Sequence, residues 1–395
     1  MITEILRDPK SSTEPGVDSR AVPARNYIMQ GRASDRALDI YHLIFAPTHA
    51  CNLRCKHCYL PDHDAELLPK EVALRLVDEW SEMVLEERGP WQGIFHVKGG
   101  EPFVVSYLGD IMERLISLQS LRLMLTTNGT FTNTKTLNML RSCNERLHGN
   151  VNVVVSLDGA SAETHDTLRG SGQFDVTMGF LRALQEMKIN THLNCVLHEG
   201  NVAQVPAYID LAKDLCVDQI NFLPLVPKGY GSAIRCLQAP HLQVHQAVQA
   251  VYDSGDEATR SLLAGSLAHI LDREKNHGIP AAHECVAAYR GLFYIIPDGS
   301  AFTCPNLIGT GHSVGNVRTA SLRELSDRLT NLYRGLRSSD TNDRYVCTGE
   351  RHLYEKTKDS KNIESLEALQ QALTRDSSRE KSPKRSIAYC VSRNY

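Results

Sequence analysis

Short apolar segments alternate with amphipathic ones along the middle of the chain. The apolar segments are rich in β-branched and aromatic side chains, which is typical of buried strands. They lie at 41–45, 93–97, 121–125, 151–156, 192–197 and 219–223. Between them, apolar residues recur at helical spacing over about 69–87, 104–119, 133–146, 174–189 and 203–215. Strands that alternate with helices predict a parallel sheet with right-handed crossovers.

We therefore expect an α/β fold in which 39–235 form a partial (β/α)6 TIM-like barrel. In such a barrel the functional groups lie at the carboxyl ends of the strands. Loops that directly follow the strands are thus the first places to look for chemistry.

The segments on either side of the barrel differ from it in composition and in apolar pattern. Residues 1–38 are polar without a sustained apolar period, which predicts an N-terminal extension. We expect 236–280 to be a helical connector and 353–395 to be a C-terminal helix with a mobile basic tail. Between them, 281–352 are predicted to form a small domain with a β-hairpin over 293–302. Ser321 and Glu324 have the spacing of a capping box, so a helix should follow that hairpin.

Composition excludes several classes of function. The formal net charge is -3 and no basic stripe accompanies it, so we expect no nucleic-acid partner. No segment has the length and apolarity of a membrane span, and the first residues lack the apolar region of a signal peptide. The expected location is the cytoplasm, where thiols stay reduced. There, an odd count of 11 cysteines with three clustered indicates metal rather than disulfides.

Those three cysteines are Cys51, Cys55 and Cys58, and they directly follow the first predicted strand. Three thiolates on one loop can hold three irons of a cubane cluster and leave the fourth iron open for chemistry. Zinc is the alternative, although zinc loops usually bring thiolates in C-x-x-C pairs and add a fourth ligand. The spacing favours an iron–sulfur cluster over zinc.

Over about 43–350 these features resemble the radical S-adenosylmethionine (radical SAM) enzymes. The resemblance implies that Cys51, Cys55 and Cys58 bind a catalytic [4Fe–4S] cluster whose open iron chelates S-adenosylmethionine. It also implies that the backbone of His57 lies near the adenine. Such enzymes form a 5′-deoxyadenosyl radical that abstracts a hydrogen atom from the substrate.

Two further segments carry the resemblance. Gly99, Gly100, Glu101 and Pro102 follow the second strand and match the loop that binds the methionine amino group. The segment after the fourth strand implies that Ser156 and Arg169 contact the cofactor or a carboxylate and that Asp158 faces the substrate. For each of these three residues, a strand-end cap or a surface charge is the alternative.

Cys285, Cys304 and Cys347 resemble the auxiliary-cluster domain called SPASM, or its shorter twitch form. The resemblance implies one auxiliary [4Fe–4S] cluster. Its fourth iron would be open or would take Glu350, His352 or Cys390. A degenerate domain without a cluster is the alternative. Cys236, in the loop after the sixth strand, is either a thiol that returns a hydrogen atom or a bystander.

Enzymes with such a domain mainly modify ribosomally made peptides, by crosslinking or epimerisation. The family resemblance therefore implies a precursor peptide as substrate and a flavodoxin- or ferredoxin-type electron donor. Two alternatives stay open: a dehydrogenase or epimerase of an aminoglycoside-like molecule, and a non-catalytic metal-binding regulatory protein.

Overall fold

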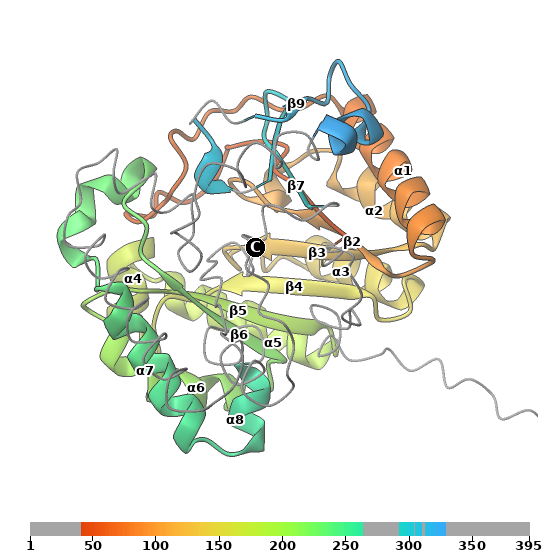
Figure 1. Cartoon of the computed structure of the whole chain (residues 1–395). Helices are drawn as coiled ribbons and strands as arrows, with labels where there is room; N and C mark the ends of the chain where they lie inside the picture. Colours follow the sequence, from red (N-terminus) through yellow and green to blue (C-terminus); the bar gives the residue numbers. More distant parts are fainter. Residues whose placement is uncertain (1–40, 264–291, 304, 310–312, 329–395) are drawn as a thin grey trace, which may run out of the picture.

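The computed structural model describes residues 41–263, 292–303, 305–309 and 313–328. Its centre is a sheet of parallel strands in which each strand neighbours the next one along the chain (Figure 1). These strands are β1 (His42–Phe45), β2 (Gly93–Val97), β3 (Leu121–Thr127), β4 (Val151–Ser156), β5 (Asn190–Leu197) and β6 (Gln219–Pro224). The predicted strands are confirmed, with ends that differ by two residues at most.

Helices connect successive strands. They are α1 (Lys70–Glu87), α2 (Leu108–Leu118), α3 (Thr134–Arg146), α4 (Ala162–Arg169), α5 (Gln173–Glu186) and α6 (Val205–Asp214). Short 3-10 turns precede two of them, η2 (Pro102–Val104) and η3 (Val202–Gln204). After β6 come η4 (Gly229–Leu237), α7 (His241–Ser254) and α8 (Glu257–Leu262). The expected helices are present; α4 was not expected, because its eight residues carry too short an apolar pattern.

The predicted hairpin is confirmed, and it extends the barrel sheet. It consists of β7 (Leu292–Ile295) and β8 (Ser300–Phe302), joined by a turn and followed by β9 (Gly315–Asn316). β7 pairs in parallel with β1, so that His42 lies opposite Leu292. The hairpin expected in a domain of its own thus belongs to the same sheet, whose order is β6-β5-β4-β3-β2-β1-β7-β8-β9. β6 and β9 end this sheet, so the described barrel is open.

Alternate residues of each strand point to opposite faces of the sheet. The outward residues, such as Leu43, Phe95, Leu123 and Val153, are fully buried in the core with the helices. The opposite face holds Thr126, Ser156 and Asn194, among others, and surrounds the lumen of the open barrel. The outer face is therefore apolar, whereas the inner face combines polar side chains with a smaller apolar cluster that includes Ile44, Leu292 and Tyr294.

Local sequence fixes where the helices begin. The Asn133 side chain accepts a hydrogen bond from the Thr136 amide (3.0 Å) and caps α3. The predicted capping box is also confirmed. The Ser321 amide donates to Glu324 Oε2 (2.7 Å), and the Glu324 amide donates to Ser321 Oγ (3.3 Å), at the start of the helical residues 322–328.

Trp80 joins three elements of the core. It is fully buried in α1, where Leu76, Val77 and Val84 extend the same apolar stripe. Its indole nitrogen donates to the Ile94 carbonyl of β2 (3.0 Å), and its ring meets the edge of Phe293 of β7, with ring centroids 6.1 Å apart. One side chain thus packs the first helix against both neighbours of β1.

None of the described helices is long and apolar enough to cross a membrane.

We expect Trp80→Ala to lower the free energy of unfolding by about 3–5 kcal/mol, because it leaves a cavity and an unpaired carbonyl. Chemical denaturation of the purified protein measures this. Leu85→Ala, at an exposed position of the same helix, is the matched control and should change stability little. A loss below about 1 kcal/mol for Trp80→Ala would contradict this account of the core.

Candidate functional site

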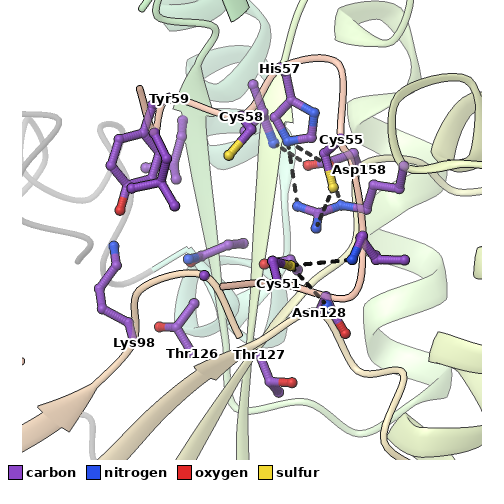
Figure 2. A pocket seen from close by; sticks show the side chains of 18 of the residues that line it. Cys51, Cys55, His57, Cys58, Tyr59, Lys98, Thr126, Thr127, Asn128 and Asp158 are labelled. Atoms are coloured by element: carbon purple, nitrogen blue, oxygen red, sulfur yellow. Dashed lines mark hydrogen bonds and ion pairs between the residues drawn. The ribbon is translucent and has the colours of Figure 1, made fainter. Parts of the chain in front are cut away.

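A pocket opens at the carboxyl ends of the strands, where the barrel topology places function (Figure 2). The cysteine loop after β1 and the glycine loop after β2 form part of its wall. The ends of β3 to β6 form the rest. Its lining includes Cys51, Cys55, His57, Cys58, Tyr59, Lys98, Gly99, Gly100, Thr126, Asn128, Ser156, Asp158, Arg169, Asn194, Val196 and Leu225.

The three predicted cysteines all line this pocket and are spaced around it in Figure 2. Their loop has little regular structure, so tertiary contacts hold it. The Lys56 amide donates to the Leu168 carbonyl at the end of α4 (2.9 Å), and the Gly231 amide of η4 donates to the Cys58 carbonyl (3.0 Å). The structure therefore brings together side chains that the spacing placed on one loop.

Burial makes the three thiols hard to ionise by themselves. It raises the pKa values of Cys51 and Cys55, and it raises that of Cys58 to about 11. A bound cation would reverse this, because thiolates are the form that ligates metals. In the described part of the chain, no three His, Cys, Asp or Glu side chains converge closely enough for a single metal ion. Three thiolates match a cubane cluster with one open iron, whereas a structural zinc site takes a fourth ligand, so the donor set fits the cluster better than zinc.

The glycine loop packs directly under the cysteine loop. A Cβ atom on Gly100 would lie 2.0 Å from the Ala50 carbonyl oxygen, and one on Gly99 would lie 2.5 Å from that of Thr48. Gly99 also has a φ of 131°, which disfavours other residues. Only glycine fits at these two positions, and both glycines line the pocket.

Glu101 and Pro102, which sequence reasoning grouped with the glycines, do not line the pocket. Glu101 is buried beneath it. The carboxylate accepts hydrogen bonds from the Thr127 hydroxyl (2.8 Å) and the Asn128 amide (2.9 Å). Burial outweighs these bonds and raises the pKa of Glu101 to about 7. Its clear structural role is to join the glycine loop to the turn after β3.

Asp158 is the most heavily bonded side chain of the site. Its side chain is fully buried, Oδ2 accepts from Arg169 Nε (2.5 Å) and lies 3.2 Å from His57 Nε2, and Oδ1 accepts from the Val196 amide (2.8 Å). Burial alone would raise the pKa of Asp158, but Arg169 and His57 outweigh it and hold the value at about 2. Both of its oxygens are bonded within the protein and its side chain also lines the pocket, so a position facing the substrate stays a prediction.

Arg169 and His57 connect that carboxylate to the cysteine loop. Arg169 Nη1 lies 3.9 Å from Cys55 Sγ, and Arg169 Nη2 lies 3.5 Å from His57 Nε2. Burial lowers the pKa of His57 to about 4, although Asp158 opposes it, so the imidazole is neutral near pH 7. His57 Nδ1 is buried and has no hydrogen-bond partner among the described residues. It is an acceptor that a ligand in the pocket can satisfy.

The remaining predicted residues fall into two groups. Ser156 lines the pocket as expected, whereas Cys236 is exposed on η4 and is not part of the lining. Cys285, Cys304 and Cys347 lie outside the described residues, as do Glu350, His352 and Cys390. Sequence reasoning missed Lys98, although a lysine at the end of a buried strand next to Gly99 was a usable indication.

Comparison with known proteins identifies the domain. Residues 45–212 match the model of the Radical SAM superfamily, a range that holds all three loop cysteines and the glycine loop. The chain carries a radical SAM domain. The chain is therefore an enzyme with a radical SAM domain, and the alternative of a regulatory metal protein is disfavoured.

Two relatives of this chain carry names of different activities. The AdoMet-dependent heme synthase of Methanosarcina barkeri is 25% identical over 307 residues, which cover 74% of this chain and 83% of the relative. The mycofactocin maturase MftC of Mycobacterium tuberculosis is 26% identical over 296 residues, which cover 73% of this chain and 71% of MftC.

Solved structures confirm the fold. SuiB of Streptococcus suis, bound to its precursor peptide SuiA, superposes with a TM-score of 0.59 at 18% identity. That match covers 90% of this chain and 76% of SuiB. The AdoMet-bound enzyme anSMEcpe gives a TM-score of 0.57 at 20% identity, over 74% of this chain and 81% of its own. The predicted TIM-like α/β fold is thereby confirmed.

Asp158→Asn should lower the free energy of unfolding by about 2–3 kcal/mol at pH 7, because it leaves the buried Arg169 charge uncompensated. The native pKa of Asp158, about 2, is depressed below the unfolded value. Its contribution is thus complete above about pH 4 and is lost as the pH falls towards 2, where the two proteins should converge.

Denaturation of both proteins across this pH range measures the effect. Glu113→Gln, which removes an exposed pair with Arg146, is the control and should change little at any pH. An Asp158→Asn protein as stable as the wild type at pH 7 would refute the structural role of this ion pair.

Proposed function

We propose that this protein cleaves S-adenosylmethionine reductively and uses the resulting radical to remove a hydrogen atom from a peptide substrate. The observation that carries the proposal is the joint lining of one pocket by Cys51, Cys55 and Cys58 with the Gly99–Gly100 loop. When bound, a [4Fe–4S] cluster with an open iron supplies the electron that cleaves the sulfonium to a 5′-deoxyadenosyl radical. The chain supplies binding, orientation and exclusion of water.

Each part of the pocket has a role in this proposal. Cys51, Cys55 and Cys58 hold the cluster, and the missing Cβ atoms of Gly99 and Gly100 let the backbone approach the cofactor. Ser156 and Asn194, at the ends of β4 and β5, present polar groups to its ribose or carboxylate. Figure 2 shows these loops around one space, so cofactor and substrate would meet there.

Arg169 and Asp158 act as a pair in this scheme. Arg169 lines the pocket and holds its charge beside Cys55, where it can bind a cofactor carboxylate. Asp158 orients that guanidinium, which gives it a positioning role in this scheme. His57 contributes an acceptor at Nδ1 and packing against the cysteine loop.

Two observations favour a peptide as the substrate. MftC is named a maturase, and the structure of SuiB holds a precursor peptide. The identity with the heme synthase of Methanosarcina barkeri favours a second candidate, the modification of a tetrapyrrole. An auxiliary cluster on Cys285, Cys304 and Cys347 stays a prediction, as does a flavodoxin- or ferredoxin-type electron donor.

Anaerobic reconstitution tests the cofactor. The wild type should bind iron and sulfide and form 5′-deoxyadenosine, whereas the triple variant Cys51→Ala/Cys55→Ala/Cys58→Ala should bind about four fewer irons and form none. A total of about eight irons in the wild type would indicate the auxiliary cluster, and about four would exclude it. Cys143→Ala, a buried cysteine of α3, is the matched control. Zinc in place of iron, without deoxyadenosine, would refute the proposal.

Mass spectrometry tests the substrate. We expect a precursor peptide from a neighbouring gene, co-expressed with the enzyme, to lose two hydrogens on crosslinking or to gain deuterium from solvent on epimerisation. The triple variant is the control. An unmodified peptide beside a modified tetrapyrrole would replace the peptide with the second candidate.

A further inference from the structure

The face of the sheet that lines the barrel lumen is polar along much of its length. On the same face of the sheet as the pocket residues lie His96, Asn152, His192 and Asn221, each a few positions before a pocket residue of its own strand or the loop that follows it. Barrel interiors are normally filled with layers of branched apolar side chains. A polar interior lacks that hydrophobic stabilisation. We therefore expect these polar side chains to serve a function.

Two hydrogen-bonded rows cross this face. His96 Nδ1 lies 3.0 Å from His42 Nε2 and His96 Nε2 lies 2.7 Å from the Thr126 hydroxyl. On the other side, the Asn221 side chain donates from Nδ2 to Asn194 Oδ1 (2.9 Å). These rows orient polar groups towards the lumen and leave few rotamers open to them.

The inner face is also incompletely filled and incompletely bonded. Met124 and Thr126, in a central strand, are only half-buried. His192 is 5% exposed, and its Nε2 atom has no hydrogen-bond partner among the described residues. His192 shares its face with Asn194 and Val196, which line the pocket. The pocket lining thus includes residues of the lumen face, and His192, two positions before Asn194 on that face, carries a polar atom that a ligand could satisfy.

The charged side chains that the strands place on this face are all basic. None of the strands β1–β9 contains an Asp or Glu, whereas Lys98 and Arg122 lie on or directly after strands that face the lumen. The two carboxylates nearest the pocket are engaged: Asp158 pairs with Arg169, and Glu101 bonds to the turn after β3. A cationic ligand would find no carboxylate among these lumen-facing strand residues.

Lys98 is placed where pocket and lumen meet. It is 5% exposed and lines the pocket, with its ammonium 5.4 Å from the ring centroid of Tyr59 and 5.5 Å from that of Tyr294. The hydroxyls of these tyrosines are hydrogen-bonded to each other at 2.7 Å. Figure 2 shows Lys98 extending towards Tyr59 on the side of Cys58. The two rings fix the ammonium near the reactive centre by cation–π contacts.

We propose that the lumen binds a carboxylate-bearing substrate and that Lys98 is the residue that anchors its carboxylate. The proposal deepens the proposed function and rests on it, since it names the chemical class that the radical acts on. A peptide with an acidic side chain or a free C-terminus carries such a carboxylate, and so does a tetrapyrrole with carboxylate side chains. An aminoglycoside-like cation does not.

Equilibrium binding to the cluster-reconstituted full chain, with S-adenosylmethionine present, tests this. The probes are a Glu-containing peptide with a free C-terminus, its Gln and C-terminal amide counterpart, coproporphyrin III and kanamycin. We expect a carboxylate probe to bind about tenfold or more tightly than the amide peptide and kanamycin. Lys98→Met should remove that preference and Lys98→Arg should keep it. Lys135→Met, exposed on α3, is the matched control.

The outcomes are separable. Preference for the acidic peptide supports a peptide source, and Lys98-dependent binding of coproporphyrin III alone supports a tetrapyrrole source. Equal or tighter binding of kanamycin, no binding of any carboxylate probe, or an unchanged preference in Lys98→Met overturns the proposal. If Lys98→Met does not fold, the comparison of the probes on the wild type still tests whether the protein prefers carboxylates. Deoxyadenosine formation without added substrate, measured in parallel, reports separately on the proposed function.

Discussion

A single buried carboxylate holds the functional end of the barrel together. Asp158 follows β4, and its side chain binds the amide of Val196 in β5, the guanidinium of Arg169 at the end of α4 and the ring of His57 in the cysteine loop. A charge without solvent is costly unless it is paired and hydrogen-bonded, so this group constrains all its partners at once. The cysteine loop, which has little regular structure of its own, takes part of its position from that constraint.

The same constraint links the fold to the proposed chemistry. Arg169 is buried beside Cys55 because Asp158 compensates its charge, and it therefore carries a fixed positive charge at the pocket. On the other side of the loop, Gly99 and Gly100 allow a backbone contact that a Cβ atom would prevent. A cofactor in this pocket would meet preorganised groups that need little rearrangement, which is how proteins support a reaction whose organic chemistry belongs to the cofactor.

The sheet divides two environments that the enzyme needs in one domain. Its outer face packs Leu43, Phe95 and Leu123 against the helices and supplies hydrophobic stabilisation. Its inner face combines hydrogen-bonded polar rows, such as His42–His96–Thr126, with a smaller apolar cluster that includes Ile44, Leu292 and Tyr294. Most of the hydrophobic stabilisation thus comes from the outer face, which allows much of the inner face to be polar.

Much of this could be predicted from local pattern. The bounds of β2 and β4, the capping box at Ser321 and the three-thiol loop follow from periodicity and spacing, because strands, caps and ligand loops depend on residues a few positions apart. The pairing of β7 with β1 could not be predicted, since it joins residues about 250 positions apart and leaves no local trace. The same holds for α4, whose short sequence carries too few apolar positions.

The functional residues divide in the same way. The sequence by itself determined which residue types lie on the loops after β1 and β2, and hence the class of cofactor that this protein can use. Only the tertiary structure decided which side chains meet: that Asp158 pairs with Arg169, that Glu101 bonds to the turn after β3, and that Lys98 contacts the rings of both Tyr59 and Tyr294. The physical reason is that charge pairing and burial depend on distances in space, which the parallel sheet sets between residues far apart in the chain.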